Sequence, residues 1–244
     1  MNKRKSLLQV LPAALMLFSA AVSIYAQEKT GAKHNARPQQ VGAAPAVRAD
    51  TKTEAAVKYT YEFSQPKFYV KHIVIEHDAN GRGTVTFERL NEDTPVTEPL
   101  ELSPDALARI NSSWQALQFL ESETNYQSSK QFPHLGTMRI GVQRGDHKRV
   151  AEFNWTNNSA ASNLVNEYRK AADQAILVFD IAIARENQPL NAPKLMEVME
   201  SLLKRNGLSD PRQLLKLLED ISTDEHVPLI ARNHALRLIK QIQK

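Results

Sequence analysis

Apolar and polar residues alternate along the first part of the chain that has the composition of a folded domain. Residues 57–63 alternate between apolar side chains and charged or hydroxyl side chains, which is typical of a β-strand with one buried face. Residues 68–77 are rich in β-branched and aromatic side chains and predict a central strand. Asn80 and Gly81 then favour a hairpin turn, and residues 84–89 predict the returning antiparallel strand.

A helix is predicted after a loop that contains Pro95 and Pro99. Ser103 is a typical N-cap residue, Pro104 suits the first helical turn, and Asp105 places a negative charge near the positive end of the helix dipole. Apolar residues then recur three or four positions apart, as expected for one buried helix face: Leu107, Ile110, Trp114 and Leu117.

The same order of elements follows a second time. Alternating apolar positions predict strands at residues 137–144 and 148–155, and residues 157–159 can cap a long helix that runs to about Arg185. The apolar stripe of this helix consists of Leu164, Tyr168, Ala172, Ala175, Phe179 and Ile183. We therefore expect residues 57–187 to form an α+β domain: an antiparallel sheet built from two β-hairpin-plus-helix units, with the helices on one face.

Residues 188–244 have a purely helical pattern. Pro193 opens one helix, which Asn206 and Gly207 close, and Pro211 lies in the first turn of the next. A last helix carries apolar residues as far as Ile242. We expect this segment to form a small all-helical C-terminal domain.

Part of this helical segment resembles one HEAT-type repeat. The resemblance covers residues 211–243 and rests on Leu214, Leu215, Leu218, Asp220, Asp224, Val227, Pro228, Ala231, Ala235 and Leu236. The two alanines are four positions apart, whereas three is usual, and no second copy is visible. HEAT arrays bind other proteins, so the resemblance implies a helical hairpin with a partner surface, packed against residues 194–206 or against the sheet. The rest of the chain resembles uncharacterised exported bacterial proteins.

The N-terminus has the layout of a secretory signal peptide. A basic start is followed by an apolar run from Leu7 to Val22 and by a small residue, Ala26, so we expect residues 1–26 to be removed after export to the periplasm or the extracellular space. An uncleaved membrane anchor is the alternative, and it would be the only contact with a membrane. Residues 27–56 hold prolines, glycines and alanines without an aromatic side chain, which predicts a disordered tether.

The charge distribution changes the set of expected partners. The formal charge of +4 falls to +1 when the three cations of the signal peptide are removed. Residues 57–187 carry 14 Lys or Arg and 17 Asp or Glu, so the α+β domain is net acidic. We therefore expect no nucleic-acid partner. The sequence leaves the oligomeric state open.

Few residues have the spacing that catalysis or metal binding requires. The chain has no cysteine, and no nucleotide-binding or metal motif is present, so we expect no cofactor. His72 and His77 are five positions apart on one strand and should point to opposite faces. In the loop at residues 121–135, a hydroxyl, an amine and an imidazole come close in sequence: Ser128, Ser129, Lys130 and His134. These residues support the alternative hypothesis of an envelope hydrolase.

Two groups of cations are candidate binding residues. Arg139, Arg144, Lys148 and Arg149 lie on the second predicted hairpin near Phe153 and Trp155, an arrangement that can hold an anionic ligand. Arg232, Arg237 and Lys240 lie on the last helix and are the candidate partner surface. The leading hypothesis is an exported, non-enzymatic interaction or scaffold protein that binds another protein of the periplasm or cell envelope.

Overall fold

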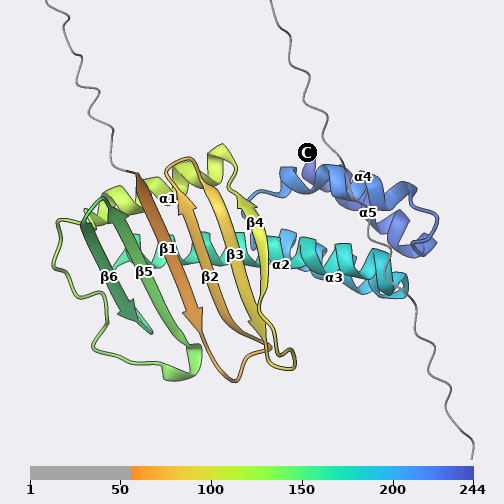
Figure 1. Ribbon diagram of the computed structural model, residues 1–244. Coiled ribbons are helices and arrows are strands. Elements are labelled where there is room, and N and C mark those ends of the chain that lie inside the picture. Colours follow the sequence, from red (N-terminus) through yellow and green to blue (C-terminus); the bar gives the residue numbers. More distant parts are fainter. Residues whose placement is uncertain (1–55) are drawn as a thin grey trace, which may run out of the picture. The chain divides into compact units, whose positions relative to one another are not determined.

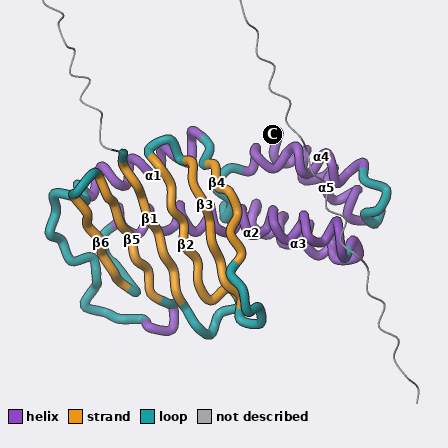
Figure 2. The backbone as a smooth tube through the Cα atoms, viewed as in Figure 1, coloured by secondary structure: helices purple, strands orange, loops and turns teal. Residues whose placement is uncertain are grey.

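The computed structural model describes residues 56–244, which belong to one compact unit. The predicted signal peptide and all but the last residue of the predicted tether lie outside the described residues. The six strands form one antiparallel sheet in the order β4-β3-β2-β1-β5-β6, and helices α1 and α2 cover one of its faces (Figures 1 and 2). The predicted α+β class is therefore confirmed, and no helix of residues 56–244 covers the other sheet face, here named the open face.

The strands follow the predicted alternation with one addition. They are β1 (Val57–Ser64), β2 (Val70–Asp78), β3 (Arg82–Arg89), β4 (Val96–Glu101), β5 (Thr137–Arg144) and β6 (His147–Phe153). The loop predicted around Pro95 and Pro99 contains β4, so four strands precede the first helix, one more than the alternation predicts and two more than a single hairpin-plus-helix unit would have. β4 is an edge strand, where proline is tolerated because an N–H directed away from the sheet is not needed for pairing.

Close backbone approach explains one glycine in the sheet. A Cβ atom on Gly83 of β3 would lie 1.8 Å from the carbonyl oxygen of Glu76 in β2, so any side chain there would force the two strands apart. Gly141 of β5 differs, because a Cβ at that position would meet its nearest neighbour at 3.4 Å. Gly83 therefore permits the β2–β3 pairing.

The two long helices begin where their capping residues predict. Helix α1 (Pro104–Leu117) is capped by Ser103, whose Oγ accepts a hydrogen bond from the amide of Ala106. Helix α2 (Ser159–Asn187) is capped by Asn158, whose side chain accepts from the amide of Ala161. Both helices pack their apolar sides on the sheet and on each other.

Helix α2 belongs to two hydrophobic cores. Its first half, with Leu164 and Tyr168, packs under the sheet, and its second half packs Leu177 and Ile181 into a core made with the C-terminal helices. The predicted stripe is wrong at its end, because Ile183 is exposed. The buried side of the helix changes where its packing partner changes from the sheet to other helices.

The C-terminal segment contains α3 (Ala192–Lys204), α4 (Leu215–Thr223) and α5 (Leu229–Ile242), with short 3-10 turns at Pro189–Asn191 and Pro211–Leu214. A further 3-10 turn, Pro133–Leu135, precedes β5. Helices α4 and α5 form an antiparallel hairpin, and α5 also packs against α3. Within residues 56–244, no helix has both the length and the apolar character needed to span a membrane.

Candidate functional site

A hollow of about 800 Å³ lies under one end of the sheet, between α2 and the strand ends. Figure 1 shows the strands continuing beyond α1 and α2 at this end, so the helices leave part of the sheet uncovered. The hollow, here named the aromatic pocket, is mainly apolar. Its apolar lining includes Phe63, Ile73, Leu135, Met138, Phe153 and Val165.

Three aromatic side chains at the rim of the aromatic pocket are exposed. Phe68 is 44%, Tyr69 60% and Trp155 42% accessible, and all three line the pocket. The ring of Phe68 is 6.0 Å from that of Phe63 at the pocket wall. Exposed apolar side chains gathered around one hollow are typical of binding sites in soluble proteins.

One part of the aromatic pocket is polar. Tyr61 lines the pocket, and its buried hydroxyl donates to no acceptor in the described residues. Burial raises the pKa of Tyr61 to about 12, and the nearby Arg169, through its charge and as a hydrogen-bond donor, partly offsets this effect. The guanidinium of Arg169 lies 5.5 Å from the centre of the Phe63 ring, and within residues 56–244 it has no carboxylate within 4 Å. Asp173 follows one helical turn later.

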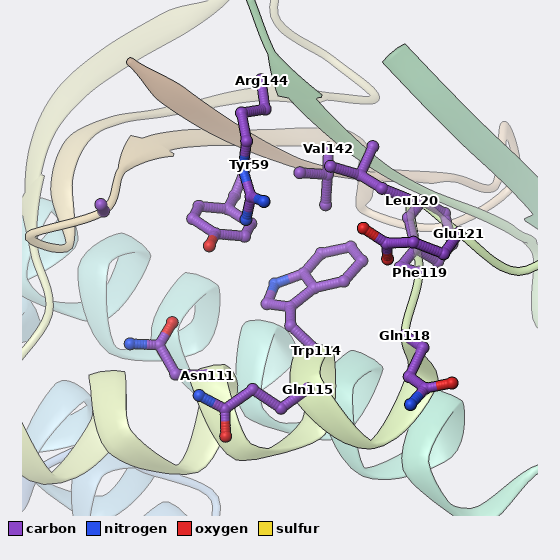
Figure 3. Close-up of a pocket in the computed structure, with 11 residues that line it drawn as sticks. Tyr59, Asn111, Trp114, Gln115, Gln118, Phe119, Leu120, Glu121, Val142 and Arg144 are labelled. Atoms are coloured by element: carbon purple, nitrogen blue, oxygen red, sulfur yellow. The ribbon is translucent and has the colours of Figure 1, made fainter. Parts of the chain in front are cut away.

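A second hollow, of about 400 Å³, lies between α1, the loop that follows it and the ends of β1 and β5 (Figure 3). Figure 3 shows Trp114 between α1 and the sheet, with Tyr59 and Arg144 opposite it. We name this second hollow the polar pocket, because polar side chains surround it: Tyr59, Asn111, Gln115, Gln118, Glu121 and Arg144. They can hydrogen-bond a polar ligand, but exposed amides and charges are equally satisfied by water, so the arrangement does not select a ligand.

A buried chain of hydrogen bonds lies beneath the polar pocket. The indole N–H of Trp114 donates to the hydroxyl oxygen of Tyr168 at 3.0 Å, and this hydroxyl is 2.8 Å from Nε2 of His77. Nδ1 of His77 is 2.7 Å from the carbonyl oxygen of Asp78, which can only accept. Nδ1 therefore carries the proton and Tyr168 donates to Nε2. Burial lowers the pKa of His77 and keeps the ring neutral.

The four candidate anion-binding residues do not form one cluster. Arg139 lies on the open face and pairs with Glu62 and Glu152, while Lys148 is exposed on the same face. Arg144 lies at the polar pocket, on the side of the sheet that faces the helices. The fourth cation, Arg149, donates to two backbone carbonyls, those of Phe119 and Thr124. The division between faces follows from the alternation of side chains along β5 and β6.

The open face carries a network of paired charges. His72 lies between Glu62 and Glu88, at 3.1 Å from each, and Lys58 pairs with Glu76 at 2.7 Å. Because His77 is buried on the helix side, the prediction that the two histidines point to opposite faces is confirmed. Within residues 56–244, no group of three histidine or carboxylate side chains is placed to hold a metal ion.

In the described chain, no hydrogen bond joins the side chain of one residue of the hydrolase hypothesis to the side chain of another. The hydroxyl of Ser128 accepts from the amide of Lys130 and from the side chain of Asn157. Ser129, Lys130 and His134 are exposed. Within residues 56–244, neither Ser128 nor Ser129 forms a hydrogen bond to an amine or imidazole base, which nucleophilic catalysis requires.

The candidate partner cations border an exposed apolar strip on α5. Leu229, Ile230 and Leu236 are 61%, 66% and 45% accessible, and Arg237 and Lys240 are exposed on the same helix. We name these five residues the α5 surface. The third predicted cation, Arg232, is half-buried, with its Nε lacking a partner in the described residues.

Sequence reasoning missed the aromatic pocket. Trp155 lies at the end of the strand predicted at residues 148–155, but β6 ends at Phe153 and Trp155 is exposed. The chain leaves the sheet there because the carbonyl of Trp155 accepts from the amide of Ser128, and the amide of Asn154 donates to the side chain of Gln127. One signal was available: Phe68 and Tyr69 are consecutive, and a strand cannot bury both on one face.

No protein-family model and no curated protein sequence matches this chain.

Proposed function

We propose that this protein is an exported, non-enzymatic interaction protein that binds a partner protein of the cell envelope through the α5 surface. The observation that carries the proposal is the exposed strip of Leu229, Ile230 and Leu236, bordered by Arg237 and Lys240. Leu229 and Leu236 are seven positions apart, so they lie on the same side of the helix. Apolar side chains in the centre with charged residues at the rim are typical of protein interfaces.

The charge of this helix indicates the chemistry of the partner. From residue 229 to residue 244 the chain carries four Lys or Arg and no Asp or Glu. None of the four cations forms an ion pair within residues 56–244. A partner surface with apolar side chains bordered by carboxylates would complement both features, and the opposite charges would mainly speed association.

The export part of the proposal rests on residues 1–26. N-terminal sequencing of the protein recovered from the periplasm should begin at Gln27 if cleavage follows Ala26. A protein recovered from the membrane with Met1 in place would support the anchor instead.

A matched pair of leucine variants tests the partner surface. The full-length protein, its Leu229→Ser/Leu236→Ser variant and a Leu190→Ser control are cross-linked in intact cells, and the captured proteins are compared. Leu190 is 84% accessible but lies outside the α5 surface. We expect the double variant to lose a partner that the wild type and the control retain. Loss of the same partner in the control, or retention in the double variant, would contradict this assignment.

The cations are tested separately with the purified partner. Arg237→Gln/Lys240→Gln should weaken binding at low salt and reduce the dependence of the association rate on salt. Unchanged association at low salt would contradict a role for these charges.

A further inference from the structure

We infer that the aromatic pocket binds a free long-chain carboxylate, with the acidic group at Arg169 and Tyr61 and the apolar chain along the uncovered end of the sheet. This site is separate from the α5 surface, so the inference does not rest on the proposed function. Its residues come from β1, β2, β5, β6, α2 and the adjoining loops.

The shape of the pocket follows from how far the helices cover the sheet. Phe63 and Met138 belong to the face that the helices cover elsewhere, and both line the hollow. Phe68, Tyr69 and Trp155 extend its apolar wall to the surface. A volume of about 800 Å³ lies within the range of small-molecule sites. An apolar chain would cover surface that the protein's own helices leave exposed.

The Tyr61 hydroxyl supplies the first polar contact. Tyr61 is fully buried and lines the pocket, and its hydroxyl has no partner in residues 56–244. Buried hydroxyls in native proteins nearly always have a hydrogen-bond partner. Because the phenol keeps its proton at neutral pH, it can donate to a ligand oxygen. A carboxylate oxygen would provide the missing acceptor.

Arg169 supplies the charge. Its guanidinium stacks over Phe63 and approaches the sulfur of Met138 at 3.5 Å, with no carboxylate within 4 Å in the described part of the chain. Lys67 is a second cation in the lining, and Asp173 is the one acidic residue there. The described lining therefore carries two positive charges and one negative charge. This net positive charge favours a ligand with a single negative charge over a neutral or cationic ligand.

Asp173 is the acidic group of the described lining that a bound carboxylate would face. Its pKa is raised because nearby protein atoms displace water from its carboxyl group, although the residue as a whole is exposed. The charges of Arg205 and Arg169 offset part of this effect.

Three probes with the same twelve-carbon chain test the head group. Dodecanoate and dodecyltrimethylammonium, each below its micelle concentration, and dodecanol, below its solubility limit, are titrated into the full-length protein, and the fluorescence of Trp155 is followed. A Trp155→Phe variant identifies the signal that comes from the buried Trp114. We expect dodecanoate to bind most tightly and dodecyltrimethylammonium most weakly.

Two substitutions separate the charge from the apolar contact. Arg169→Gln should weaken dodecanoate binding by about tenfold or more, because a hydrogen bond to a charged group is lost, and should leave dodecanol binding nearly unchanged. Arg144→Gln removes the same charge at the polar pocket and should alter neither affinity. Tyr61→Phe, which keeps the ring and its packing, should weaken dodecanoate binding alone, so the test does not depend on whether Arg169→Gln folds.

Each of three results would overturn the inference. Equal affinities for dodecanoate and dodecanol would show that no acidic group is recognised. Binding to vesicles of phosphatidylglycerol without binding of monomeric dodecanoate would assign the pocket to a membrane surface. An apolar peptide that quenches Trp155, when no amphiphile does, would assign it to a protein partner. The leucine variants on α5 should bind dodecanoate like the wild type, so this test and the partner test can fail independently.

Discussion

Replacing Tyr168 by phenylalanine should strongly destabilise the fold, although it removes only one oxygen atom. Tyr168 is fully buried, and its hydroxyl accepts from the indole of Trp114 and donates to Nε2 of His77. Burial raises the pKa of the phenol, so the hydroxyl keeps its proton and the chain of hydrogen bonds has one direction. The substitution leaves two buried polar groups, the indole N–H and Nε2, without partners.

The size of the effect follows from these two groups. A buried polar group without a partner costs about 1–3 kcal/mol, so Tyr168→Phe should lower the free energy of unfolding by about 2–6 kcal/mol. The matched control is Tyr61→Phe, whose ring stacks on that of Tyr168 with centroids 5.2 Å apart. Because the Tyr61 hydroxyl has no partner to lose in the described residues, removing it should change stability by less than about 1 kcal/mol, or raise it.

Urea unfolding at neutral pH measures both variants. We expect a large fall in the midpoint for Tyr168→Phe and almost none for Tyr61→Phe, with the same slope as the wild type in each case. If the two midpoints were equal, or if Tyr61→Phe were the more destabilised, the hydrogen-bond assignment around His77 would be wrong. A changed slope would point to the denatured state instead.

Two further predictions concern the sheet and the buried histidine. Gly83→Ala should lower the free energy of unfolding by about 1–3 kcal/mol or more, because the new Cβ would overlap the carbonyl oxygen of Glu76. The control, Gly141→Ala, should change the free energy of unfolding by less than about 1 kcal/mol. Equal thermal unfolding temperatures for the two variants would contradict the strand contact. Burial lowers the pKa of His77 in the folded state, whereas in the unfolded state this pKa is about 6.5. Below pH 6.5 the unfolded state therefore binds more protons than the folded state. The contribution of His77 to stability is complete above that pH and is lost as the pH falls. Urea midpoints between pH 5 and 8 should therefore fall toward acid in the wild type more than in His77→Gln, and parallel curves would assign the dependence to other groups.

Periodicity predicted most strands and helices because those elements bury one face against a single partner. It failed where the partner changes: Ile183 continues the stripe of α2, but by that point the helix packs against other helices and Ile183 is exposed. Periodicity also failed at β4, because Pro99 indicated a loop. Proline is tolerated in a strand at the edge of a sheet, and β4 is an edge strand. Local sequence does not show which partner an element meets or where a sheet ends.

The candidate site was less accessible from sequence than the fold. Lys148 and Arg149 are neighbours in sequence, yet the alternation of a strand directs one to the open face and the other toward the helices, so a cluster in sequence is not a cluster in space. The aromatic pocket joins Tyr61 to Arg169, more than 100 positions later. Its volume depends on the position of α2 across the sheet, which follows from tertiary packing.

The contacts of α2 with the C-terminal segment explain why this helix does not cover the aromatic pocket. Helix α2 carries Leu177 into the second core and pairs Arg185 with Asp224, with 2.9 Å between Nη2 and Oδ2. Arg109 of α1 donates to the carbonyl oxygen of Ser209 at 2.7 Å, which joins the helices under the sheet to the C-terminal segment. A shift of α2 toward the uncovered strand ends would break these contacts and open the second core. Within residues 56–244, the C-terminal helices therefore hold α2 in a position that leaves the aromatic pocket open.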